Sequence, residues 1–263
     1  MREIGIEELK RIQLDMLLSI HDFCMNNGID YSLAAGTLIG AIRHKGYIPW
    51  DDDVDILMTR PNYDKFLKSF NGYKKHLEVI APELNWNYYA PYANVFDNRT
   101  ILFEGNNGHR GIDIGIKIDI FPIDGAPNNP SKYMDLCDSI YFYNRLLFIK
   151  RHKGLSLKHL IGKLFLLPVS YTVIQKRIHK LSLIYDYCRS DLACLLVFDP
   201  IAFRAPRSIF ENYTNIEFEG HEFMTVKDYD LFMILRYGDY MKLPPIEEQI
   251  PTHNFSAYWK DNR

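Results

Sequence analysis

The sequence predicts a mixed α/β (α+β) fold, in which a mixed sheet is flanked by helices and carries a helical insertion. Helical patterns alternate with short apolar segments over residues 6–70, and strand-type segments crowd residues 77–121. Long helical patterns then occupy residues 130–188. A chain of 263 residues is long enough for one large hydrophobic core with such an elaboration.

The N-terminal part predicts two helices joined by a short strand. Residues 6–27 place apolar side chains at three- and four-residue steps, which predicts an amphipathic helix that ends at Gly28. A strand over residues 31–36 then leads into a Gly-Thr turn. Thr37 is expected to cap the second helix, and Gly46 to stop it.

Strand patterns dominate the next stretch. Residues 51–58, DDDVDILM, predict a strand because Val54, Ile56 and Met58 alternate with their neighbours, and Pro61 begins another helix. Enrichment in β-branched and aromatic residues, with Gly, Asn and Pro between the segments, predicts strands within residues 77–81, 86–97, 100–104 and 114–124.

Three parts are expected to form one catalytic unit. Residues 1–129 are the predicted core, residues 130–190 a helical subdomain, and residues 191–263 a C-terminal part that packs on the core. The C-terminal part reads as a small hairpin, a helix and an extended tail that folds back.

Composition excludes several classes of protein. A net charge of -2 provides no basic field for nucleic acid, so we expect no nucleic-acid partner. The four cysteines have no C-x-x-C spacing and predict reduced thiols in a cytoplasmic protein. The N-terminus lacks the pattern of a signal peptide. Residues 155–181 are too interrupted by Lys, His and Pro to span a bilayer, so no membrane-spanning helix is expected.

The segment AAGTLIGAIRHKGYIPWDDDVDILMTR (34–60) concentrates negative charge where a strand should begin. Along a strand, Asp51, Asp53 and Asp55 would share one face and Asp52 would point to the other. Carboxylates this close repel one another unless a cation lies among them. A divalent ion with oxygen ligands, such as Mg²⁺, is the simplest compensation.

Three interpretations of this acidic segment compete. A solvated acidic turn is the simplest, but the tryptophan before it and the apolar strand after it argue against this. A calcium loop fails because Ile56 stands where glycine is required and Asn62 where glutamate is required. A metal-dependent nucleotidyl-transfer type of site fits best, because a helix that starts at Gly36 and Thr37 offers free N–H groups to phosphate.

Such a site usually takes a third carboxylate from a neighbouring strand. Asp119 in KIDIFPID is the best candidate, because an unpaired charge in an apolar strand would be costly; a buried ion pair with Lys or Arg is the alternative. Asp113 and Asp124 are weaker candidates because they lie closer to turns.

The segments AAGTLIGAIRHKGYIPWDDDVDILMTRPNYDKF (34–66) and KIDIFPID (117–124), together with the C-terminal FEG, YGDYMKLPP and His253, resemble the LicD family of phosphocholine transferases. This family is related to fukutin-type ribitol-phosphate transferases. The resemblance implies a nucleotidyltransferase-like fold that moves phosphocholine from CDP-choline to a hydroxyl of a cell-surface glycan, of the teichoic acid or lipopolysaccharide type, or its lipid-linked precursor, with release of CMP. It also implies that Asp53, Asp55 and Asp119 hold Mg²⁺, with Mn²⁺ as the alternative ion. Transfer of another phospho-alditol, such as ribitol or glycerol phosphate, or of a nucleotidyl group stays open, as does a non-catalytic, cation-stabilised glycan-binding protein.

The resemblance also suggests roles for the surrounding residues. Gly36 and Thr37 match the phosphate-binding turn, and Asp51 matches an acid of the same motif. The proton of the attacking hydroxyl would go to a carboxylate of the group or to His253. Basic residues beside the acids are expected either to bind the donor phosphates or to form ordinary ion pairs with Asp51 or Asp52. They are Arg43, His44, Lys45 and Arg60.

Two further surfaces follow from composition. Quaternary ammonium groups bind aromatic faces, and the aromatic residues near the motif offer either a cage or ordinary core packing. They are Tyr47, Trp50, Trp86, Tyr88, Tyr89 and Tyr92. Basic residues of the helical region suggest either peripheral docking on the anionic inner leaflet or a solvated face. They are Lys150, Arg151, Lys153, Lys158, Lys163, Lys176, Arg177 and Lys180.

Overall fold

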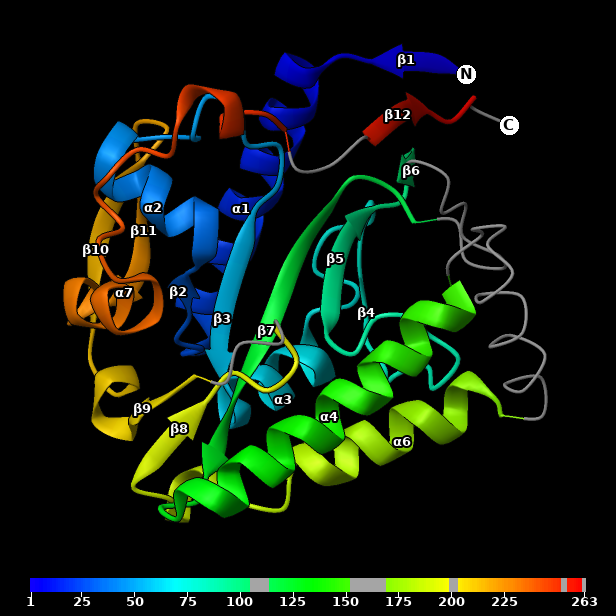
Figure 1. Ribbon diagram of the computed structural model, residues 1–263. Helices are drawn as coiled ribbons and strands as arrows, with labels where there is room; N and C mark the ends of the chain where they lie inside the picture. The colour runs from blue at the N-terminus through cyan, green and yellow to red at the C-terminus, as the bar shows by residue number, and fades with distance from the viewer. Residues whose placement is uncertain (105–113, 152–168, 199–202, 252–254, 262–263) are drawn as a thin grey trace.

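A computed structural model describes residues 1–104, 114–151, 169–198, 203–251 and 255–261 of the chain (Figure 1). Its centre is a seven-stranded mixed sheet whose main path runs in the order β2-β3-β7-β5-β4. The two central strands, β3 and β7, are parallel, and the pairings β2 to β3, β5 to β7 and β4 to β5 are antiparallel. The strands of this path are β2 (Ser32–Leu33), β3 (Asp55–Thr59), β7 (Lys117–Ala126), β5 (Ala93–Asp97) and β4 (Leu77–Ile80). The structure thus confirms the mixed α/β class.

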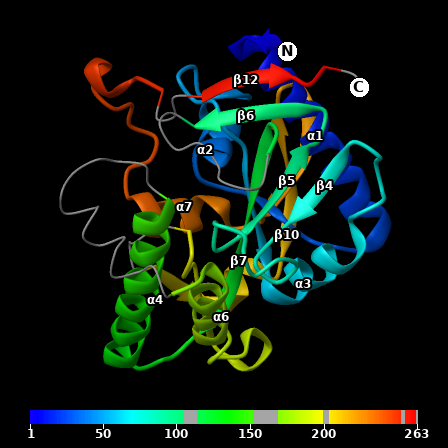
Figure 2. The same cartoon turned by 90° about the vertical axis from the view of Figure 1, so that its right-hand side faces the viewer.

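Smaller β structures surround this path. Strand β8 (Leu192–Cys194) pairs with the end of β7 and with β9 (Arg204–Pro206). Strands β10 (Tyr213–Phe218) and β11 (His221–Val226) form the predicted C-terminal hairpin. The tail also folds back as predicted: β12 (Phe255–Trp259) lies between β1 (Arg2–Ile4) and β6 (Thr100–Glu104), which brings the two termini together (Figures 1 and 2).

Three helices of the N-terminal part surround the parallel strands: α1 (Ile6–Asn27), α2 (Ala35–His44) and α3 (Arg60–Ser69). The first is confirmed with its predicted end, because Gly28 adopts a left-handed conformation and its N–H bonds to the carbonyl of Cys24. The buried side chains of α1 and α3 form one continuous core with the strands. This core fixes the ends of β3 and β7, where the acids lie.

The helical region forms a second layer at one end of the sheet. Helices α4 (Pro130–Arg151) and α6 (Tyr171–Ser182) pack side by side (Figure 2). They share a smaller core with Leu196 and Val197, which follow β8. Residues 155–168 of the predicted helical pair lie outside the described part of the chain. In the described residues, no helix combines the length and the apolar character required to cross a bilayer.

Among the described residues, the remaining α-helix is α7 (Tyr229–Tyr237), which matches the helix expected after the hairpin. Short 3-10 turns complete the described chain at Tyr187–Arg189, Arg207–Phe210 and Ile246–Glu248.

Several predicted boundaries were wrong. The second helix begins at Ala35, so Thr37 is not its cap, and Lys45 rather than Gly46 takes the left-handed position at its end. Strand β3 begins at Asp55, because Asp51 closes a turn in which its N–H bonds to the carbonyl of Ile48. Only residues 93–97 of the predicted strand 86–97 are extended.

Candidate active site

Two of the predicted acids are neighbours on the central parallel strands. Asp55 is the first residue of β3, and the parallel register places it opposite Asp119 of β7. The N–H of Asp119 bonds to the carbonyl of Val54 at 3.0 Å, which holds the two strand starts together. Both carboxylates are buried, with about a tenth of each residue or less exposed. Parallel pairing therefore brings two acids together that are 64 positions apart in sequence.

Asp53 completes this group from the loop before β3. It lines a small cavity of about 10 Å³ together with Lys117, Asp119 and Gln13 of α1. A space of this size holds about one water molecule or ion. Asp53 and Asp119 therefore line one cavity, and Asp55 lies opposite Asp119 on the neighbouring strand.

The loop that precedes β3 gathers the other acids. One carboxylate oxygen from each of Asp51, Asp52 and Asp53 lies within 4.8 Å of the others. The prediction that Asp52 points away was wrong, because alternation applies to a strand and this segment is a loop. The Nε2 of Gln13 donates a hydrogen bond to the backbone carbonyl of Asp52 at 3.1 Å and fixes the loop on α1.

Gly36 and Thr37 connect the first turn of α2 to these acids. A Cβ atom on Gly36 would lie 2.1 Å from Oδ2 of Asp51, so only glycine allows this approach. The hydroxyl of Thr37 accepts a hydrogen bond from the backbone N–H of Asp55 at 2.9 Å. Because the free N–H groups of a helix lie in its first turn, the start of α2 offers an anion site beside the carboxylates.

The electrostatics of the group show an excess of negative charge. Burial raises the pKa of Asp55 well above its usual value, and the charges of Asp53 and Asp119 raise it further. Lys117 opposes this effect. An added cation would remove the repulsion, and carboxylate oxygens are the ligands that Mg²⁺ prefers.

Lys117 is a site residue that the sequence analysis did not name, and it forms the buried ion pair considered there as the alternative for Asp119. Its Nζ lies 2.7 and 2.9 Å from the two carboxylate oxygens of Asp119. Burial alone would lower the pKa of Lys117, but Asp119 outweighs this and raises it. The sequence signal was the i, i+2 spacing of Lys117 and Asp119 on one strand, which places both side chains on the same face.

Asn94 is the second missed residue. It lies opposite Asp119 on the antiparallel strand β5, and its Nδ2 donates a hydrogen bond to Oδ1 of Asp119. The hydroxyl of Tyr88 donates in turn to the carboxamide oxygen of Asn94. A polar amide within the apolar segment ANVFD was the available signal, because such a group needs a buried partner.

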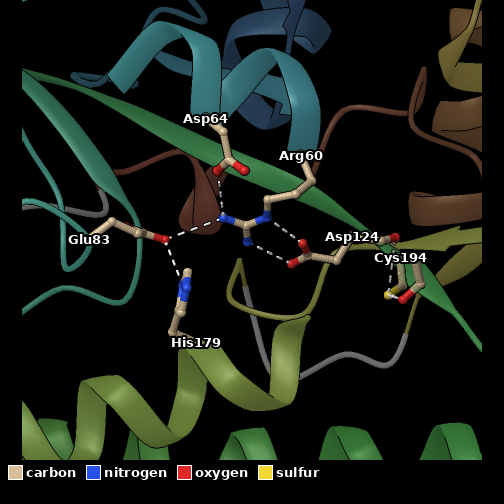
Figure 3. A network of polar contacts seen from close by, with 7 residues as sticks. Arg60, Asp64, Glu83, Asp124, His179 and Cys194 are labelled. Carbon is tan, nitrogen blue, oxygen red and sulfur yellow. Dashed lines mark hydrogen bonds and ion pairs between the residues drawn. The ribbon is translucent and has the colours of Figure 1, made fainter. Parts of the chain in front are cut away.

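The structure does not bring Arg60 to the acids. Its guanidinium forms two hydrogen bonds with Asp124, at 2.7 and 3.0 Å, and contacts Glu83 at 3.3 Å (Figure 3). Arg60 follows the last residue of β3, about 16 Å along the strand from Asp55 at roughly 3.3 Å per residue. Asp124 is consequently a structural partner here and not a third acid of the site.

The other predicted basic residues lie on α2 and its end. Arg43 donates hydrogen bonds to the backbone carbonyls of Tyr240 and Lys242, at 3.1 and 3.4 Å. Lys45 is exposed, and its carbonyl accepts a hydrogen bond from the N–H of Glu219. His44 packs edge-on against Trp50. His253 and Asp113 lie outside the described residues.

The aromatic residues near the motif do not converge on one cage. Tyr47 packs against Phe218, and Trp86 packs against His179 of α6. Tyr89 and Tyr92 instead line a cavity beneath α4.

Comparison with known proteins identifies relatives. Residues 28–142 match the family described as LicD/FKTN/FKRP, nucleotidyltransferase domain. The lipopolysaccharide cholinephosphotransferase LicD of Haemophilus influenzae is 31% identical, over 98% of this chain and 99% of its own length. Uncharacterised proteins of Rickettsia typhi and Rickettsia prowazekii are 46% and 41% identical over shorter segments, 29% and 21% of this chain and 27% and 21% of their own.

Proposed function

Because the chain belongs to the LicD family, we propose that it transfers phosphocholine from CDP-choline to a hydroxyl of a cell-surface glycan or its lipid-linked precursor, and releases CMP. The observation that carries this proposal is the end-to-end similarity to a lipopolysaccharide cholinephosphotransferase. The acid group lies within the matched nucleotidyltransferase segment, at Asp53, Asp55 and Asp119.

The donor set supports a requirement for Mg²⁺, with Mn²⁺ as the alternative. Asp53, Asp55 and Asp119 provide oxygen ligands only, and burial and mutual repulsion raise the pKa of Asp55. Such a set selects a hard divalent cation. When bound there, the ion would neutralise the charge that develops on the pyrophosphate in phosphoryl transfer.

The protein's own groups supply positioning. The first turn of α2 offers N–H groups to a donor phosphate, and Gly36 leaves room for close approach. Lys117 provides a fixed positive charge beside Asp119. A carboxylate of the group would accept the proton from the attacking hydroxyl, and His253 is the alternative base.

A product-release assay tests the proposal. The protein is incubated with Mg²⁺, a glycan acceptor and, separately, CDP-choline, CDP-ribitol, CDP-glycerol or CTP. Release of CMP from CDP-choline that depends on acceptor is the expected result. Release from another CDP-alcohol would identify a phospho-alditol transferase, and pyrophosphate release from CTP a nucleotidyltransferase.

A binding-only role is separated by an inactive variant. Asp55→Asn should abolish CMP release while circular dichroism shows an intact fold. Absence of release from every donor by the wild type, with glycan binding that needs a divalent cation, would indicate a glycan-binding protein instead.

We also propose a cytoplasmic location with peripheral contact at the inner leaflet. The described parts of α4 and α6 carry Lys150, Lys176, Arg177 and Lys180, together with exposed Phe142 and Val173. Basic and apolar side chains on neighbouring helices suit an anionic membrane surface. Flotation with liposomes of anionic lipid should recover the protein in a salt-sensitive manner, and recovery equal to that with neutral lipid would contradict the proposal.

A further inference from the structure

A cavity of about 450 Å³ lies between α4 and the central sheet. Its volume falls within the roughly 300–1,000 Å³ of small-molecule sites. One face of α4 lines it at Asn144, Arg145 and Arg151, and the segment before β5 contributes Tyr89 and Tyr92. No ligand has yet been proposed for this cavity.

The charged side chains that line this cavity are positive. Arg145 and Arg151 are the charged residues of the described lining, which contains no carboxylate. The guanidinium of Arg151 lies 4.3 Å from the ring centre of Tyr89. A quaternary ammonium group would therefore meet like charge here, whereas a phosphate would meet two arginines.

Asn144 indicates a polar, hydrogen-bonding ligand. Its Oδ1 atom is buried and has no hydrogen-bond partner among the described residues. Buried polar atoms are normally paired, and a carboxamide offers both an acceptor and a donor. A heterocycle with an amino group beside a ring nitrogen would satisfy both.

The aromatic wall suits a planar ring. Tyr92 packs on Phe121 at 4.3 Å between ring centres, and Phe121 packs on Phe198 at 4.4 Å. Nucleic-acid bases stack on such side chains. A base, a sugar and a phosphate together match the aromatic wall, the carboxamide and the arginines.

The lining of the cavity is connected to the acid group through β7. Lys117, Asp119 and Phe121 alternate along β7 and share one face of the strand, and Tyr92 packs on Phe121. Burial raises the pKa of Tyr92, and the nearby charge of Asp119 raises it further. A ligand in the cavity can therefore reach the acids with its phosphate end.

We infer that this cavity binds the nucleotide half of the donor, with the base against Tyr89 and Tyr92, Asn144 on the edge of the base, and Arg145 and Arg151 on the anionic groups. This inference rests on the proposed function for the identity of the base as cytosine. It places the choline end outside the cavity, on the other side of the pyrophosphate.

Isothermal titration of CMP into the full chain tests the inference, with Mg²⁺ and separately with EDTA. Asn144→Ala and Arg145→Ala should each weaken CMP binding by about 3- to 10-fold, as expected for one hydrogen bond or one charge-assisted contact. Arg189→Ala, in the 3-10 turn before β8, is the matched control, since this exposed arginine does not line the cavity and should leave the Kd unchanged. Phosphocholine should bind both cavity variants as it binds the wild type.

Three results would overturn the inference. The first is CMP affinity within twofold of wild type in both cavity variants, and the second is no CMP binding by the wild type. The third is selective loss of binding of dodecyl phosphate, a probe for a lipid phosphate, in the variants with CMP binding unaffected.

The inference and the proposed function can fail separately. Asn144- and Arg145-dependent CMP binding without CMP release from CDP-choline would refute the reaction and keep the nucleotide site. Acceptor-dependent release of CMP, with the CMP Kd and the donor KM unchanged in the two variants, would keep the reaction and refute the nucleotide site.

Discussion

Asp55 and Asp119 lie directly opposite each other in the parallel register of β3 and β7, at the same end of both strands. Neither residue is close to the other in sequence, and the pairing depends on the strand order alone. At the other end of these strands, Arg60 and Asp124 form a buried ion pair. The strand pair therefore has a repulsive end, suited to a cation, and a neutralised end, suited to a core.

Asp119→Asn should reduce phosphocholine transfer at least about 100-fold, because electrostatic groups at a reacting phosphate typically contribute several kcal/mol. Removing the charge also removes the ion pair between Asp119 and Lys117. Steady-state release of CMP measures the effect, and circular dichroism checks the fold. Asp135→Asn, an exposed acid on α4, is the control and should keep wild-type activity. A rate of CMP release by Asp119→Asn within fivefold of wild type would show that Asp119 does not contribute to the transfer.

Gly36→Ala should abolish most activity through sterics rather than charge. The added Cβ would lie 2.1 Å from Asp51 and must displace either the carboxylate or the first turn of α2. Gly5→Ala is a matched control, because a Cβ at Gly5 meets no atom within 4 Å. We expect full transfer activity for Gly5→Ala and at least a tenfold higher donor KM or lower kcat for Gly36→Ala. Equal kinetics for the two variants would show that α2 does not approach the donor.

Helix α1 and strand β7, which position the site, could be predicted from periodicity, because local patterns indicate whether a segment is helical or extended. The position of Asp52 could not be predicted, because it depends on the turn that Asp51 closes onto Ile48. Arg60 was misplaced for a related reason. It is only five positions from Asp55 in sequence, but the extended strand between them carries it to the opposite end of β3.

The partners of Asp119 illustrate what required the tertiary structure. Asn94 reaches Asp119 only through antiparallel pairing of β5 with β7, a contact 25 positions apart. The cavity beneath α4 likewise combines three separate segments of chain. Sequence could supply the residue types of the site, and strand order decided which of them meet.

The stability of the protein should depend on pH through Asp55. A raised folded-state pKa means that the folded state holds this proton more tightly, so the free energy of unfolding falls as pH rises from the ordinary value of 3.8 through the folded value. Asp55→Asn removes the repulsion and should raise the Tm at neutral pH in EDTA, with a smaller difference near pH 4. Mg²⁺ should raise the Tm of wild type more than that of Asp55→Asn. Thermal unfolding across pH, with and without Mg²⁺, measures both effects. Equal Mg²⁺ responses would contradict a metal role for Asp55.

Arg60→Gln should destabilise the fold without changing the KM for the donor. It leaves Asp124 buried without its two hydrogen bonds, and breaking a buried ion pair costs about 3–5 kcal/mol. Urea unfolding measures the loss, and Arg11→Gln, an exposed arginine on α1, is the control. At temperatures where the variant is folded, the donor KM should match wild type. A normal stability with a raised KM would instead make Arg60 a phosphate ligand.

Acid should loosen the contact of α6 with the start of α3 through Glu83. This carboxylate contacts Arg60 at 3.3 Å and His179 of α6 at 3.2 Å (Figure 3). Burial alone would raise the pKa of Glu83, but the hydrogen bond with His179 and the charge of Arg60 outweigh it and hold the pKa below 4.5. The stabilisation is therefore present above pH 4.5 and is lost as pH falls through the folded value. Hydrogen exchange of α6 in wild type should accelerate below pH 4.5, after correction for intrinsic rates, more than exchange in α1. Glu83→Gln should already show fast exchange in α6 at neutral pH and little further change on acidification. Identical pH profiles for the two proteins would show that Glu83 does not hold this helix.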